Sequence, residues 1–143
     1  MTLRAALTGT LVSIGVLLSV PPGSCQDLPE GTEIVSTQEE YVIADPFVQR
    51  LLYKWTEDCL GQKGDVDGVE WRVANAIYNV TRRHFNLGVY FSNLKGRRVI
   101  ILTTRTLFDP QTITHEAIHD ILRVSDPIPE HVREKCEYGY KGG

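Results

Sequence analysis

The stretch TITHEAIHDIL, residues 112–122, has two histidines four positions apart and a glutamate directly after the first. Asp109 and Pro110 stand before it as an N-cap and a proline in the first helical turn, so a helix should begin there. It should end near Val124, because the prolines that follow cannot continue it. The stretch therefore predicts a helix that carries both histidines.

The two histidines share one face of this helix. At about 100° per residue, His115 and His119 lie about 40° apart, so both imidazoles can bind one zinc ion at about 2.0–2.1 Å. Glu116 is rotated by about 100°, so it flanks the ion and can take a proton from a zinc-activated water. An apolar stripe that can cover a sheet lies on the opposite side and consists of Ile113, Ala117, Ile121 and Val124. The alternative is a solvated helix face without metal.

The sequence upstream predicts a second helix and a small sheet. Asp45-Pro46 starts a helix whose apolar residues recur at helical spacing up to Cys59. Three β-rich runs follow at 69–78, 87–91 and 99–104, with a hairpin turn in NLKGRR before the last. We expect an α+β fold in which a small antiparallel or mixed sheet of about three strands packs on the N-terminal helix and on the HExxH helix.

Residues 1–25 read as an export signal. Arg4 precedes an uncharged apolar run that is too short to span a bilayer, and small residues and prolines follow. Gly-Ser-Cys25 resembles the end of a bacterial lipoprotein signal, in which the cysteine is lipidated, and simple cleavage near Cys25 is the alternative. Residues 26–44 then form a tether and residues 45–143 the domain. Both routes predict an extracytoplasmic protein, either lipid-anchored in a bacterial envelope or secreted.

The three cysteines fit this reading. A lipid on Cys25 would leave Cys59 and Cys136 as one pair, with no odd thiol in an oxidising compartment. Their disulfide would close a loop of about 77 residues and stabilise the fold by roughly 2–5 kcal/mol. The length of 143 residues favours one domain. The net charge of −3, without a basic cluster, gives no indication of nucleic-acid binding.

HEAIH after a β-rich segment resembles the active-site motif of the zincin metallopeptidases. That resemblance implies that His115 and His119 are zinc ligands and that Glu116 is the general base. The chain is also similar to short exported bacterial members, in which a His-Glu-x-x-His-Asp-Leu-Leu-like helix is followed by a histidine and a cysteine; HEAIHDIL, His131 and Cys136 keep that order. The likeness covers roughly residues 55–136, and only the five-residue motif is specific.

A catalytic zinc site needs a third protein ligand. The metzincin extension is absent, because Leu122 and Ser125 stand where that subgroup has glycine and histidine. We expect His131 to be this ligand, on a short helix started by Pro129, with Asp126 and Glu130 as the alternatives.

Asp120 either orients a ligand or is solvated. Two functions follow from this sequence. The first is an exported zinc-dependent hydrolase, a metallopeptidase that holds an extended peptide or protein substrate along a sheet edge. The second is a non-catalytic, metal-stabilised binding or structural module of the envelope. An intact Glu116 favours the enzyme, because a structural site does not need it. The sequence defines neither the substrate nor the oligomeric state.

Overall fold

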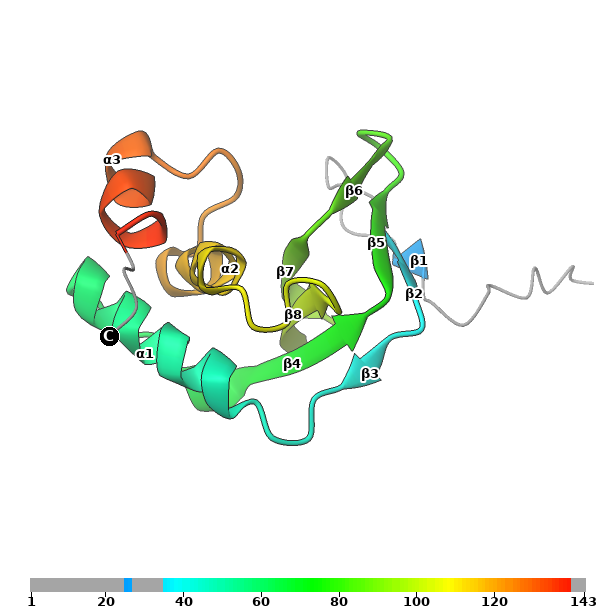
Figure 1. Cartoon of the computed structure of the whole chain (residues 1–143), viewed down its shortest axis with the longest axis horizontal. Coiled ribbons are helices and arrows are strands. Elements are labelled where there is room, and N and C mark those ends of the chain that lie inside the picture. The colour runs from blue at the N-terminus through cyan, green and yellow to red at the C-terminus, as the bar shows by residue number, and fades with distance from the viewer. Residues whose placement is uncertain (1–24, 27–34, 140–143) are drawn as a thin grey trace, which may run out of the picture.

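The computed structural model describes residues 25–26 and 35–139, which form an α+β fold, as predicted (Figure 1). The helical elements are α1 (Phe47–Leu60), the 3₁₀ turn η1 (Val66–Gly68), α2 (Pro110–Leu122), α3 (Glu130–Val132) and the π-helical turn η2 (Arg133–Glu137). The strands are β1 (Cys25–Gln26), β2 (Val35–Gln38), β3 (Tyr41–Val42), β4 (Val69–Ala74), β5 (Ala76–Asn79), β6 (His84–Asn86), β7 (Gly88–Leu94) and β8 (Arg97–Thr103).

These strands form two four-stranded sheets instead of the single three-stranded sheet that was predicted. The main sheet has the order β3-β4-β8-β7, and the second sheet has the order β1-β2-β5-β6. Strands β4 and β8 are parallel, whereas the other paired strands are antiparallel. Strand β7 is therefore an edge of the main sheet, and no strand of the described residues pairs with its outer side.

Three lengths of chain pass from one sheet into the other, and the first, residues 39–40, joins β2 to β3. The predicted strand 69–78 is divided at Asn75, whose N–H donates to the carbonyl of Gln38 (2.9 Å). Leu87 separates β6 from β7, and its carbonyl accepts from the N–H of Thr103 (3.0 Å). The hydrophobic pattern runs through both breaks, so it could not reveal them. The predicted hairpin between β7 and β8 is present, with Lys95 and Gly96 at positive φ in its turn.

Strand β8 lies between two hydrophobic clusters, which explains its continuous apolar run. Ile100 and Leu102 contact the first cluster, whereas Val99 and Ile101 contact the second. The first cluster unites α1, the main sheet and α2; its buried members are Leu52, Tyr53, Val66, Val69, Trp71, Ile100, Leu102, Ile113, Ala117 and Ile121. The second joins β8 to β2, β5 and β7. Ile113, Ala117 and Ile121 of the predicted stripe therefore face the first cluster, whereas Val124 lies beyond the end of α2.

The two long helices begin nearly where the sequence placed them. The side chain of Asp109 accepts from the N–H of Thr112 (2.9 Å) and caps α2, as predicted. Helix α1 begins at Phe47, and its N-cap is Pro46 instead of Asp45, without a side-chain cap.

The predicted tether needs correction, because residues 35–38 and 41–42 form β2 and β3 and pair with β5 and β4. A polar stretch with proline and glycine lacks the regular alternation of apolar residues by which such short strands could be recognised. Of the predicted export signal, residues 1–24 lie outside the described residues, and for Cys25 only the backbone in β1 is described. None of the helices in the described part of the chain is long and apolar enough to cross a membrane.

Candidate metal centre

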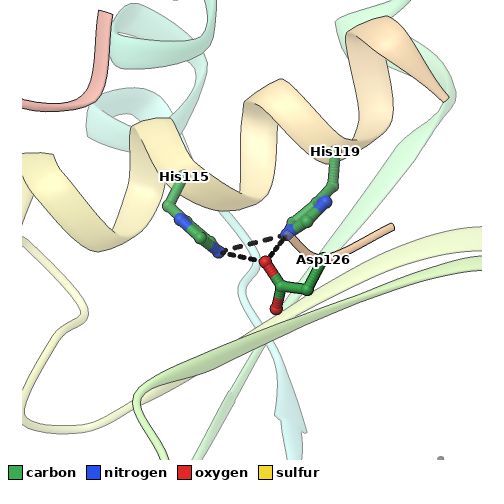
Figure 2. A group of neighbouring side chains, drawn as sticks. All are labelled: His115, His119 and Asp126. Carbon is green, nitrogen blue, oxygen red and sulfur yellow. Dashed lines mark hydrogen bonds and ion pairs between the residues drawn. The ribbon is translucent and has the colours of Figure 1, made fainter. Parts of the chain in front are cut away.

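Helix α2 brings the rings of His115 and His119 together one turn apart (Figure 2). Their Nε2 atoms are 3.1 Å apart, and the ring centroids are 4.7 Å apart. The side chain of His119 is 8% exposed and that of His115 is 24% exposed. The predicted pairing of the two imidazoles on one face is thus present, at the boundary between core and solvent.

Asp126 completes a group of three ligand atoms. Helix α2 ends at Leu122, and Arg123 adopts the left-handed conformation (φ 56°), which turns the chain back over the helix. Asp126 Oδ1 then lies 3.6 Å from Nε2 of His115 and 3.5 Å from Nε2 of His119. Figure 2 shows the carboxylate approaching both rings from the side opposite α2.

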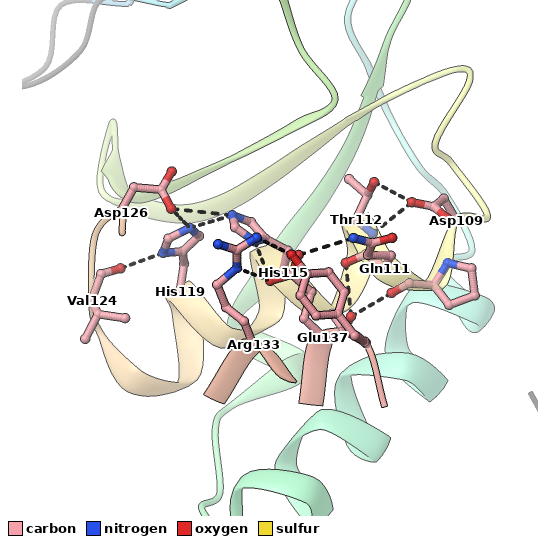
Figure 3. A network of polar contacts seen from close by, with 12 residues as sticks. Asp109, Gln111, Thr112, His115, His119, Val124, Asp126, Arg133 and Glu137 are labelled. Carbon is pink, nitrogen blue, oxygen red and sulfur yellow. Dashed lines mark hydrogen bonds and ion pairs between the residues drawn. The ribbon is translucent and has the colours of Figure 1, made fainter. Parts of the chain in front are cut away.

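The other nitrogen of each ring already has an acceptor (Figure 3). His119 Nδ1 lies 2.8 Å from the carbonyl oxygen of Val124, and His115 Nδ1 lies 3.1 Å from Oε2 of Glu137. A carbonyl and a carboxylate only accept, so both Nδ1 atoms must carry the proton. In the tautomer that carries its only proton on Nδ1, each ring directs an unprotonated Nε2 at the other ring and at Asp126. Partners of this kind fix the tautomer of metal-binding histidines.

This donor set fits a small divalent cation. Two atoms that each bind one zinc ion at about 2.0–2.1 Å in tetrahedral geometry lie about 3.3 Å apart. The three observed separations, 3.1, 3.5 and 3.6 Å, bracket that value. Two lone pairs and a carboxylate oxygen repel one another unless a cation or a proton lies between them. His115, His119 and Asp126 are therefore the described residues that would hold a metal ion.

Glu116 lies beside this group without belonging to it. It is 5% exposed, and among the described residues no hydrogen-bond donor contacts its carboxylate. Burial raises the pKa of Glu116 well above its ordinary value, and the charges of Asp126 and Glu137 raise it further. Its carboxylate packs against the backbone of Gly88 in β7, where a Cβ would lie 2.8 Å from Oε1.

Burial also tunes one of the candidate ligands. The pKa of His119 is lowered mainly by burial and by the adjacent His115, against the hydrogen bond to Val124 and the charges of Asp126 and Glu137. A lowered pKa keeps the imidazole neutral at pH 7, which is the form that binds metal.

A cleft of about 640 Å³ opens in front of these residues. Its walls come from β6, β7, α2 and the loop that carries Asp126. Two exposed apolar residues, Phe85 and Leu87, line one end. Since Thr103 N–H bonds to the Leu87 carbonyl, the alternation of an antiparallel pair directs the backbone groups of Gly88 and Tyr90 to the free edge. An extended chain could pair with that edge directly beside Glu116.

His131, the preferred third ligand in the sequence, is not brought to the two histidines. It is exposed on α3, and Asp126, one of the two alternatives, takes the place beside them. The physical reason is the left-handed turn at Arg123, which folds the loop back so early that its aspartate reaches the rings. Glu130, the other alternative, is also exposed on α3. The sequence does not show how the chain turns after α2. It therefore could not decide between Asp126, 7 positions after His119, and His131, 12 positions after it.

The disulfide between Cys59 and Cys136 is present, with 5.8 Å between the Cα atoms. It joins the last turn of α1 to η2, as the sequence predicts. Such a bond is compatible with an extracytoplasmic location. The lipid predicted on Cys25 concerns a side chain outside the described part of the structure.

Two residues beside the site were not predicted from the sequence. Glu137 directly follows Cys136 and belongs to no recognisable motif. Gly88 could have been noticed as a glycine inside a strand pattern, which often marks close approach of another group. Asp120, for which the sequence left two roles open, is not solvated: it is fully buried and accepts from Tyr53 (2.5 Å), Arg98 (2.8 Å) and Arg123 (2.7 Å).

The chain matches no protein-family model, no curated protein and no solved structure. What the protein does must therefore be inferred from the chemistry of this site.

Proposed function

We propose that this protein is an exported zinc-dependent hydrolase, a metallopeptidase in which Glu116 is the general base. One observation carries the proposal. Two Nε2 atoms and one carboxylate oxygen converge at 3.1–3.6 Å while the opposite nitrogen of each imidazole is held by an acceptor. That arrangement suits a metal ion, which would hold the three converging atoms together.

The zincin resemblance of HEAIH is part of the same proposal. In zincins the active-site helix packs under a small sheet, and here α2 shares a hydrophobic cluster with the main sheet and α1. The role of third ligand passes from His131 to Asp126. Of the histidine and cysteine that this chain shares with the short bacterial members, Cys136 then has a role, in the disulfide, whereas His131 is not a ligand.

The chemistry divides between the ion and the chain. Zinc supplies Lewis acidity and lowers the pKa of water to about 7. Glu116 takes the proton from the attacking water and returns it to the leaving amine. An extended substrate pairs with the free edge of β7, which places a peptide carbonyl beside Glu116. His115, His119 and Asp126 would hold the ion with three protein ligands, the number that is normal for catalytic zinc, which would leave it open to water or substrate.

The proposed location is the bacterial envelope, with a lipid on Cys25, or the surrounding medium. The disulfide supports export, because such bonds persist in oxidising compartments. The competing function is a metal-stabilised module that does no chemistry. It is the weaker of the two because Glu116 is buried beside the ligands without serving as one.

Metal content tests the ligand set. The purified mature protein should keep about one zinc ion per chain after dialysis. His119→Ala and Asp126→Ala should lose most of it, and His131→Ala should keep it. Equal zinc in wild type and His119→Ala would overturn the metal site, and loss of zinc in His131→Ala alone would restore the ligand set chosen from the sequence.

Turnover tests the general base. Glu116→Gln should keep its zinc and its fold, because the change is isosteric and the residue lies off the ligand group. Cleavage of a library of unstructured peptides should fall by roughly 10²–10⁴-fold, the usual contribution of a general base. If wild type and variant both hold zinc and cleave nothing, the module is the better explanation. A variant as fast as wild type would exclude Glu116 as the base.

A further inference from the structure

Glu137 occupies a position that the proposed reaction does not use. It lies at the end of η2, is 5% exposed, and approaches His115 from the side opposite the ligand group (Figure 3). Its Oε2 also accepts from Nε of Arg133 (3.2 Å), and its Oε1 lies 3.5 Å from Nε2 of Gln111. The carboxylate is thus held from two sides and directed at one imidazole nitrogen.

The segment that carries Glu137 is short, because α3 and η2 together span only residues 130–137. A helical segment of this length is held by its tertiary contacts more than by its own hydrogen bonds. The neighbouring Cys136 is fully buried, is bonded to Cys59 of α1, and packs with Ile118 and Ile128. The disulfide is therefore the covalent tie next to Glu137.

We propose that Glu137 is a positioning residue for His115 and that the Cys59–Cys136 disulfide acts on the metal site through it. Since the carboxylate accepts from Nδ1, it fixes the tautomer that leaves Nε2 free to bind metal. The disulfide holds η2 against α1 and α2, so Glu137 keeps its place beside the ring. This inference rests on the metal site proposed above. It gives the disulfide a second effect, on metal affinity, besides its effect on folding.

The expected size follows from the behaviour of such partners. Loss of an acceptor behind a metal-binding histidine typically costs about 10–100-fold in metal affinity. Glu137→Ala should therefore weaken zinc binding within that range, and Glu137→Gln should lose less, because the amide oxygen still accepts. Glu134→Ala is the matched control, since Glu134 is an exposed glutamate of the same π-helical turn. Its zinc affinity should equal that of wild type.

A double-mutant cycle tests the path from the disulfide to the metal. Zinc affinity is measured by competition with a chromophoric chelator in wild type, Glu137→Ala, the paired Cys59→Ser and Cys136→Ser variant, and the combination. If the disulfide acts through Glu137, the cysteine changes weaken binding in wild type but have no further effect once Glu137 is alanine. Effects that multiply would show that the disulfide acts on the site by another route and would overturn the proposal.

A second variant tests the positioning role even if the cysteine variant does not fold. One glycine inserted between Cys136 and Glu137 keeps the disulfide but moves the carboxylate one position along the helical turn, away from His115. It should weaken zinc binding as much as Glu137→Ala does. Wild-type affinity in this insertion variant would refute the positioning role.

A metal-free readout separates this proposal from the metal site itself. Nitrogen-15 NMR of the metal-free protein should show His115 as the Nδ1–H tautomer in wild type and Glu134→Ala. Glu137→Ala and the insertion variant should lose that preference. A locked tautomer in a protein that binds no zinc would refute the proposed function and leave the positioning role intact. A tautomer that does not respond to Glu137 would refute the positioning role, whatever the zinc affinity.

Discussion

Replacing Gly88 with alanine places a methyl group between strand β7 and the carboxylate of Glu116. The new Cβ would lie 2.8 Å from Oε1 of Glu116 and 3.0 Å from Cγ2 of Thr112. Ordinary contacts begin near 3.4 Å, so the carboxylate must retreat by at least 0.6 Å, the difference between the two distances. The end of a flexible side chain yields more easily than a paired strand does, so Glu116 should move and β7 should stay.

The expected consequence is selective. A misplacement of about 1 Å can cost about 10²-fold in rate, so a shift of 0.6 Å should lower kcat/KM by about 10–10²-fold. Zinc content should not change, because Glu116 is not one of the ligands. The free energy of unfolding should change by less than about 1 kcal/mol, because Gly88 lies in regular strand and alanine needs no unusual backbone there.

The assay compares Gly88→Ala with Ser92→Ala, a change to alanine at an exposed position of the same strand. Cleavage of the peptide library, zinc content and urea unfolding are measured for both variants. Full activity in Gly88→Ala would show that the position of the Glu116 carboxylate does not limit turnover. A fall of several kcal/mol in unfolding free energy would show that the strand gives way first, contrary to the argument above.

Two further outcomes concern stability. Asp120→Asn should lower the free energy of unfolding, measured in urea, by about 3 kcal/mol. This is the low end for a broken buried pair, because Arg98 keeps Asp65 as a partner. Asp58→Asn, at an exposed position, should change the free energy little, and equal effects of the two substitutions would contradict the buried network. In metal-free protein, the raised pKa of Glu116 means that the folded state keeps a proton that the unfolded state loses, so wild-type stability falls as pH rises above about 4.5. Glu116→Gln should therefore be the more stable protein at pH 7 and lose that advantage below pH 4.5; an advantage independent of pH would exclude this cause.

The fold was predictable where local signals agreed. Asp109-Pro110 and the apolar spacing of α2 specify one helix without help from the rest of the chain, and that helix was predicted within two residues of its observed end. The β-rich runs were found, but their assignment to sheets was not. The break at Asn75 depends on a hydrogen bond to Gln38, which lies in the segment predicted to be a tether. The hydrophobic pattern of a strand does not show which distant strand it pairs with.

The candidate site divides in the same way. His115, Glu116 and His119 are placed by one helix, so their spacing alone defines their geometry. The position of Asp126 depends on the turn at Arg123, where a non-glycine residue adopts a left-handed conformation. Such a conformation is uncommon and cannot be predicted from the sequence around it. Glu137 reaches His115 across 22 positions and could be found only in three dimensions.

The charge around Glu116 bears on the choice between enzyme and module. A general base must be ionised, yet burial and two neighbouring carboxylates, Asp126 and Glu137, oppose ionisation of Glu116. A buried carboxylate without a hydrogen-bond donor is costly for folding. A divalent cation held by His115, His119 and Asp126 would offset those negative charges and favour the ionised form. A module stabilised by metal would gain nothing from this carboxylate, whereas a hydrolase needs a base that becomes competent when the metal binds.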